Sequence, residues 1–83
     1  MPVATVRVLA FAGARDIVGA EIDLALDRLA TASDVLDALC ARFPALVPHK
    51  PHIRIAVNGS YVELDAPVAD GDEVALIPPV AGG

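Results

Sequence analysis

The chain has 83 residues, a formal charge of −5 and a hydrophobic fraction of 55%, which suffices for one domain with its own core. Its six Lys and Arg residues are scattered singly, and phosphate binding needs clustered cations, so the composition excludes a nucleic-acid-binding protein. The single cysteine, Cys40, excludes an internal disulfide and a cysteine-based zinc site, and it fits a reducing compartment.

Two strands are predicted near the N-terminus, in residues 3–11 and 20–26. Alternation divides the first between two faces, with Val6, Val8 and Ala10 on one and Arg7, Leu9 and Phe11 on the other. The second alternates strictly, with Ile22, Leu24 and Leu26 inward and Glu21, Asp23 and Asp27 outward. Residues 12–19 are predicted to form a connecting turn that contains at most one turn of helix and ends at Gly19. The two strands should therefore form a hairpin.

Residues 8–14 form a short apolar run, but Arg15 and Asp16 follow at once, which argues against a signal peptide. No stretch approaches the ~20 apolar residues of a membrane span. We therefore expect a cytoplasmic protein that does not associate with membranes.

The segment from Thr31 to Pro44 is the clearest helix. Thr31 and Asp34 have the spacing of a capping box, and an apolar stripe follows at helical spacing, made of Val35, Leu36, Leu39, Cys40 and Phe43. On this stripe Cys40 is predicted to be a buried small hydrophobe and not a reactive thiol. Pro44 ends the helix, and residues 45–52 form a proline-rich connection whose two histidines, His49 and His52, lack a third metal ligand nearby.

Three further strands are predicted in the C-terminal third. Residues 53–58 are predicted to form a strand, and Asn58-Gly59 is a tight-turn signal. Residues 61–64 are predicted to form the strand that follows this turn. A turn-rich crossing leads to the last strand, residues 73–77, in which Val74 and Leu76 face one way and Ala75 and Ile77 the other. The prolines that follow cannot donate ladder hydrogen bonds, so pairing should stop there. The pattern predicts a two-layer α+β domain over 1–83, a mixed sheet of about five strands packed on one main helix.

One helix covers only one face of this sheet. The opposite face is predicted to carry Leu9, Phe11, Ala75 and Ile77, with Tyr61 near its edge. Solvent-facing positions of an antiparallel sheet are usually polar, so this patch predicts a docking surface. The alternative is that these side chains are scattered exposed apolar residues of the ordinary kind.

Two blocks of the sequence resemble a known family. "VRVLAFAGARDIVG" near the start and "VNGSYVELDAPVADGDEVALIPPVAGG" at the end are similar to the small subunits of molybdopterin synthase, in the MoaD/ThiS group of ubiquitin-like sulfur carriers with the β-grasp fold. The final turn, strand, double proline and terminal Gly-Gly are the most specific part of the resemblance, which covers almost the whole chain.

The resemblance implies a non-catalytic carrier that holds no cofactor or metal of its own. A ubiquitin-activating-type adenylyltransferase would spend ATP to adenylate Gly83, and a sulfur donor protein would convert it to a thiocarboxylate. The extended, flexible tail, residues 78–83, would enter the large synthase subunit in a heterotetramer and give sulfur to a pterin precursor. Gly82 would accompany Gly83 into that site. The resemblance places Phe11, Tyr61 and Ile77 where the family docks apolar side chains. With the other uncovered-face residues and the tail, the residues expected to contact the partner are Leu9, Phe11, Tyr61, Ala75, Ile77, Pro78, Pro79, Val80 and Ala81.

The chemistry of the terminus agrees with this expectation. A carboxylate is a poor electrophile until it carries a good leaving group, and a glycine pair passes through channels closed to larger residues. Residues 79–83 reach at most ~16–18 Å from the sheet. Three alternatives stay open: a sulfur carrier for thiamine thiazole, cysteine or tRNA thiolation, a protein modifier joined to lysines through Gly83, and a β-grasp interaction domain with an inert tail.

Overall fold

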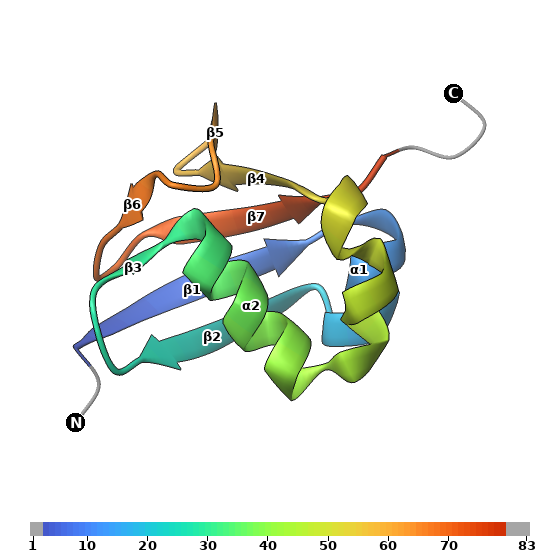
Figure 1. Ribbon diagram of the computed structural model, residues 1–83, viewed down its shortest axis with the longest axis horizontal. Coiled ribbons are helices and arrows are strands. Elements are labelled where there is room, and N and C mark those ends of the chain that lie inside the picture. Colours follow the sequence, from blue (N-terminus) through green and yellow to red (C-terminus); the bar gives the residue numbers. More distant parts are fainter. Residues whose placement is uncertain (1–2, 80–83) are drawn as a thin grey trace.

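The computed structural model describes residues 3–79 and arranges them in two layers (Figure 1). One layer is a five-stranded sheet in the order β2-β1-β7-β4-β5. Its strands are β1 (Ala4–Ala10), β2 (Glu21–Leu26), β4 (Arg54–Val57), β5 (Ser60–Val62) and β7 (Glu73–Ile77). The central pair, β1 and β7, is parallel, and the other neighbouring pairs are antiparallel. The predicted mixed sheet of five strands is confirmed.

Helix α2 (Ala32–Arg42) forms the other layer and covers one face of the sheet (Figure 1). Its predicted capping box is present: the Asp34 amide donates to Thr31 Oγ1 at 3.2 Å, and the Thr31 amide donates to Asp34 Oδ2 at 3.0 Å. The Thr31 amide is also the main reason that the pKa of Asp34 lies below its ordinary value. The predicted stripe on α2 is buried at Val35, Leu36, Leu39 and Cys40 and partly buried at Phe43.

The core lies between α2 and the sheet. It takes alternate residues from each strand, including Val6, Val8, Leu24, Leu26, Ile55, Val74 and Leu76. Alternation predicted that these positions face inward, so the predicted inward faces of these strands are confirmed. None of the helices within residues 3–79 is long and apolar enough to cross a membrane.

Two segments predicted as irregular are helical. Residues 12–18, expected to form a turn, are helix α1 (Ala12–Val18), which ends at Gly19 with φ 93°. Ala14 and Val18 are buried, so packing stabilises a helix too short to be stable alone. The proline-rich connection is a 3₁₀ helix, η1 (Pro44–His52). It buries Leu46 against the core.

The turn-rich crossing also contains a strand that the sequence did not reveal. β3 (Ala30–Thr31) and β6 (Pro67–Val68) form a small antiparallel sheet of their own. Two residues are too few to show alternation, so no periodic signal marks either strand. The predicted tight turn between β4 and β5 is confirmed, because Asn58 and Gly59 have φ values of 51° and 87°.

The side chain of Asp72 connects its own turn, just before β7, to the turn between β4 and β5. Its Oδ2 accepts from the Ala69 amide at 2.8 Å, and its Oδ1 accepts from Asn58 Nδ2 at 3.0 Å. Asn58 Oδ1 in turn accepts from the Glu73 amide at 2.9 Å. This network gives the acidic turn a structural role, and it fixes where the last strand begins.

Replacement of Asp72 by alanine should lower the free energy of unfolding at pH 7 by about 1–3 kcal/mol, since two hydrogen bonds to a carboxylate are lost. The amide of Ala69, and then the Asn58 side chain, hold the pKa of Asp72 below 3.8. A lowered pKa stabilises the fold above the unfolded value, and that contribution disappears as the pH falls through the folded value. Urea unfolding should therefore show the difference between the native chain and Asp72→Ala shrinking below about pH 4.

Asp16→Ala provides the control for this prediction, because Asp16 makes no side-chain hydrogen bond or ion pair with other residues in the described range 3–79. If the free energy of unfolding of Asp72→Ala were lower than that of the native chain by the same amount down to pH 2, the assigned role of the carboxylate would be contradicted.

Candidate functional site

The sheet face opposite α2 carries a row of apolar side chains across four adjacent strands. Leu9 of β1 lies opposite Ala75 of β7, Ala75 opposite Ala56 of β4, and Ala56 opposite Tyr61 of β5. Two further residues follow in the same alternation along β1 and β7, Phe11 and Ile77. We call these six residues, Leu9, Phe11, Ala56, Tyr61, Ala75 and Ile77, the open-face surface.

The open-face surface is partly accessible to water. Phe11 is 49% exposed and Tyr61 63%, while Ala56 is buried by its neighbours. The predicted residues therefore share one face of the sheet across adjacent strands, and their role in docking stays a prediction. Sequence reasoning missed Ala56. Alternation along residues 53–58 contained the signal, because Ala56 lies out of phase with the inward-facing Ile55 and Val57.

The polarity of this sheet face changes along its strands. Near the start of β1, Arg7 lies opposite Asp23 and beside Glu73, and its Nε forms an ion pair with Glu21 at 3.2 Å. Toward the end of β1 the face becomes apolar. Because β1 and β7 are parallel and adjacent, their C-terminal ends lie at the same end of the sheet, and so do Phe11 and Ile77. The Phe11 amide donates to the Leu76 carbonyl at 3.3 Å, and this hydrogen bond links the segment after β1 to the end of β7.

The last described residues continue from this edge. β7 ends at Ile77, as predicted, and neither Pro78 nor Pro79 has an amide hydrogen to extend the ladder. The predicted tail residues Val80, Ala81, Gly82 and Gly83 lie outside the described range 3–79. The four residues beyond Pro79 span at most about 14 Å when extended. The described structure therefore ends, at Pro79, at the same end of the molecule as the apolar part of the open-face surface.

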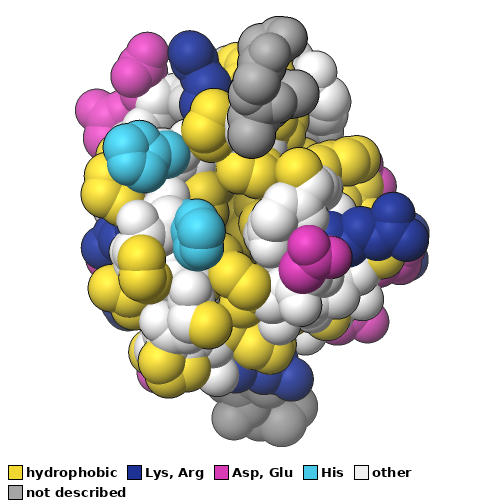
Figure 2. All heavy atoms as spheres, turned by 90° about the vertical axis from the view of Figure 1, so that its right-hand side faces the viewer, with side chains coloured by type: hydrophobic (Ala, Val, Ile, Leu, Met, Phe, Trp, Pro, Cys, Tyr) yellow, Lys and Arg dark blue, Asp and Glu magenta, His cyan; other side chains and the backbone are white. Residues whose placement is uncertain are grey.

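A cavity of 280 Å³ lies where β7 ends. Its walls come from the start of α1, from η1 and from the two prolines, through Ala12, Gly13, His49, His52, Pro78 and Pro79. Both histidines of the chain lie on this end of the molecule, among hydrophobic side chains (Figure 2). Among residues 3–79 no three His, Cys, Asp or Glu side chains are grouped so that they could hold a metal ion.

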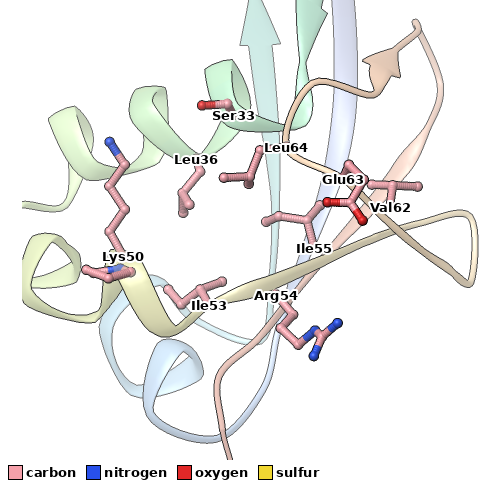
Figure 3. A pocket seen from close by; sticks show the side chains of 10 residues that line it. Ser33, Leu36, Lys50, Ile53, Arg54, Ile55, Val62, Glu63 and Leu64 are labelled. Atoms are coloured by element: carbon pink, nitrogen blue, oxygen red, sulfur yellow. The ribbon is translucent and has the colours of Figure 1, made fainter.

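A second cavity, of 330 Å³, lies on the helical side of β4 (Figure 3). Leu36 and Ile55 contribute to its apolar lining, and Lys50 lies at its rim, ion-paired with Asp37. Arg54 is also among the lining residues, and Figure 3 shows its guanidinium directed away from Leu36 and Ile55. The cavity brings together none of the residues that the sequence singled out, so it does not extend the predicted site.

Cys40 has the properties of a structural thiol. It is buried under α2, as predicted. Burial raises the pKa of the thiol, which disfavours the reactive thiolate. This result agrees with the predicted role of Cys40 as a buried small hydrophobe.

The chain is similar to known proteins over nearly its full length. A molybdopterin synthase sulfur carrier subunit from Aedes aegypti is 45% identical over 98% of this chain and 91% of its own length. The crystal structure of small archaeal modifier protein 1 from Haloferax volcanii superposes with a TM-score of 0.79 at 33% identity, over 93% of this chain and 99% of its own. In the complex of subunits 1 and 2 of molybdopterin-converting factor from Helicobacter pylori, one chain matches with a TM-score of 0.67 and 28% identity, over 95% of this chain and 99% of its own.

These neighbours confirm the predicted ubiquitin-like β-grasp fold. The family model of the ThiS family matches residues 8–83, which include the whole C-terminal block that carries the resemblance and all but the first two residues of the N-terminal block. The chain belongs to the ThiS family.

Proposed function

We propose that this chain is the sulfur carrier subunit of a molybdopterin synthase. The carboxylate of Gly83 is adenylated by a ubiquitin-activating-type enzyme that consumes ATP, and a sulfur donor protein converts it to a thiocarboxylate. The large synthase subunit then receives the tail, and sulfur passes to a pterin precursor of the molybdenum cofactor. One observation carries this proposal: the apolar part of the open-face surface and the end of β7 lie at the same edge of the sheet.

This geometry suits a carrier because docking and delivery become one event. A partner that covers Phe11 and Ile77 also meets the chain where it leaves the sheet, and the tail of residues 80–83 is long enough to enter that partner. Binding energy from the folded body then holds the reacting terminus close to the substrate, which replaces a bimolecular encounter. Pro78 and Pro79 restrict the backbone where the tail begins and lower the entropy lost on binding.

The chemistry of the terminus explains why a second enzyme is needed. A terminal carboxyl is ionised at neutral pH and does not accept a nucleophile. Adenylation turns one oxygen into part of a good leaving group, so that AMP departs when sulfur attacks the carbonyl carbon. The resulting thiocarboxylate is a soft nucleophile that requires no acid or base from its own chain. The buried Cys40 thiol is consistent with a subunit that carries sulfur without catalysing its transfer.

The proposal is tested by weighing the intact chain. After incubation with ATP, the activating enzyme and a sulfur donor, the mass should rise by the exchange of one oxygen for sulfur. Addition of the large subunit and the cyclic pterin phosphate should form the dithiolene product and return the carrier to its original mass. No exchange, under conditions that convert the Aedes aegypti relative, would contradict the proposal. Exchange without transfer to the pterin would indicate thiamine thiazole, cysteine or tRNA thiolation instead.

Protein modification is the second candidate function, favoured by the likeness to small archaeal modifier protein 1. A modifier joins its terminal carbonyl to amines, and its own chains could grow only through Lys50 or the N-terminus, since Lys50 is the one lysine. Adducts that survive denaturing, reducing electrophoresis in cell extracts, and that disappear when Gly83 is deleted, would support this function.

A further inference from the structure

Arg54 is a charged residue beside the open-face surface at the edge where β7 ends. It lies opposite Ile77 in the β4–β7 register. Its guanidinium carbon lies 5.4 Å from the centre of the Tyr61 ring, within the range of a cation–π contact. This contact and its direction away from Leu36 and Ile55 (Figure 3) place the guanidinium on the open face.

Within residues 3–79, no ion pair joins this guanidinium to a carboxylate. The ion pairs in that range join Arg7 to Glu21, Arg28 to Asp34 and Lys50 to Asp37. Arg7, the other arginine on this sheet face, already has its partner at the polar end. A partner protein that covers the apolar end would remove water from Arg54 and leave an unpaired charge, which disfavours binding unless the partner supplies the opposite charge.

We propose that Arg54 pairs with a carboxylate of the protein that covers the open-face surface, so that the matching surface is apolar with one acidic side chain facing the Arg54–Tyr61 pair. This inference rests on the proposed function, in which that protein is the large synthase subunit. The Tyr61 ring holds the guanidinium in place, so less side-chain freedom is lost when a bidentate pair forms. Because the chain is acidic overall, with a charge of −5, a basic position on its docking face selects for acidic partners.

The test measures binding of the large subunit from the same organism to the full chain and to single variants. Arg54→Ala should weaken binding at least about tenfold, and Arg54→Glu further, because one truncates the ion pair and the other repels the carboxylate. Arg54→Lys should retain part of the affinity, since a lysine keeps the charge without the planar fork. The salt dependence of the association rate should become weaker in Arg54→Ala.

Arg42→Ala is a matched control. The guanidinium carbon of Arg42 lies 5.5 Å from the centre of the Phe43 ring, so it makes a similar contact with an aromatic ring. It belongs to α2, in the layer that covers the other face of the sheet. Its removal should change the dissociation constant less than twofold, and thermal unfolding of both alanine variants confirms that each is folded.

A charge-reversal rescue identifies the partner's carboxylate. Each exposed Asp and Glu of the large subunit is changed to Lys, and one of these changes should restore binding of Arg54→Glu. The inference is overturned if the native chain and Arg54→Ala bind equally well, or if no reversal restores binding. If the native chain itself does not bind the large subunit, the proposed function fails together with this inference, whereas equal binding leaves the proposed function intact.

Discussion

A chain that carries one additional alanine after Gly83 is expected to lose sulfur transfer completely and to unfold at the same temperature as the native chain. The reacting group in the proposed function is the free carboxyl of Gly83. An added residue converts that carboxyl into an amide and moves the new one by up to about 3.6 Å. The folded body is unaffected, because β7 ends at Ile77 and six residues separate it from the added alanine.

Two measurements test this expectation. Intact mass after incubation with ATP, the activating enzyme and a sulfur donor reports formation of the thiocarboxylate, and calorimetry reports the unfolding temperature. An alanine added at the N-terminus is the matched control. β1 is parallel to β7, so β1 begins at the opposite end of the sheet, and this variant should keep full activity. Sulfur transfer by the C-terminally extended chain would show that Gly83 is not the point of attachment.

The sequence predicted those parts of the fold in which periodicity runs over many residues. β7 begins at Glu73 and ends at Ile77, as the alternation of "EVALI" and the following prolines indicated. Helix α2 begins after Thr31, where the capping box was expected. In such segments local propensity and burial indicate the same structure, which is why a single sequence suffices.

The segments that sequence reasoning misjudged owe their structure to distant residues. Helix α1 has only seven residues and exists because Ala14 and Val18 pack into the core. The 3₁₀ helix η1 contains Pro48 and Pro51, which are typical of irregular connections. The strand pair β3 and β6 is held by contacts between residues far apart in the sequence, such as Ala30 and Val68, which are 38 positions apart, and no local pattern reports such a contact.

The residues of the candidate site also differ in whether a local sequence pattern could predict them. Alternation placed Leu9, Ala75 and Ile77 on the uncovered face correctly, because each belongs to a long strand. The roles of Arg54 and Ala56 could not be inferred in the same way. Their importance depends on which strand lies beside β7, and the order β7-β4-β5 becomes known only from the structure. Strand order is a property of the whole chain, whereas alternation is a property of each segment.

Replacement of Phe11 by serine is expected to reduce binding of the large subunit by at least about 30-fold without loss of stability. Half-exposed aromatic side chains in an apolar surface are the usual hot spots of an interface, and loss of one costs about 2 kcal/mol or more. Phe11 is also the N-cap of α1, where its side chain makes no capping hydrogen bond. Serine is a favoured N-cap residue whose hydroxyl accepts from the first turn of the helix.

Two opposing effects on folding therefore accompany this change. The serine cap stabilises the start of α1 by about 0.5–2 kcal/mol, which offsets the loss of the buried half of the phenylalanine ring. We expect the free energy of unfolding to change by less than about 1 kcal/mol. A weaker complex then reflects the lost contact and not a partly unfolded carrier.

Leu29→Ser is the matched control, because Leu29 is a large apolar residue that is 71% exposed. It follows β2, whose last residue, Leu26, pairs with Ala4 at the start of β1, so Leu29 lies at the end of the sheet opposite to Phe11. Titration calorimetry with the large subunit should give the native dissociation constant for Leu29→Ser and a much larger one for Phe11→Ser. Equal losses in both variants would mean that exposed apolar area in general drives the association. Unchanged binding of Phe11→Ser would contradict the assignment of Phe11 to the interface.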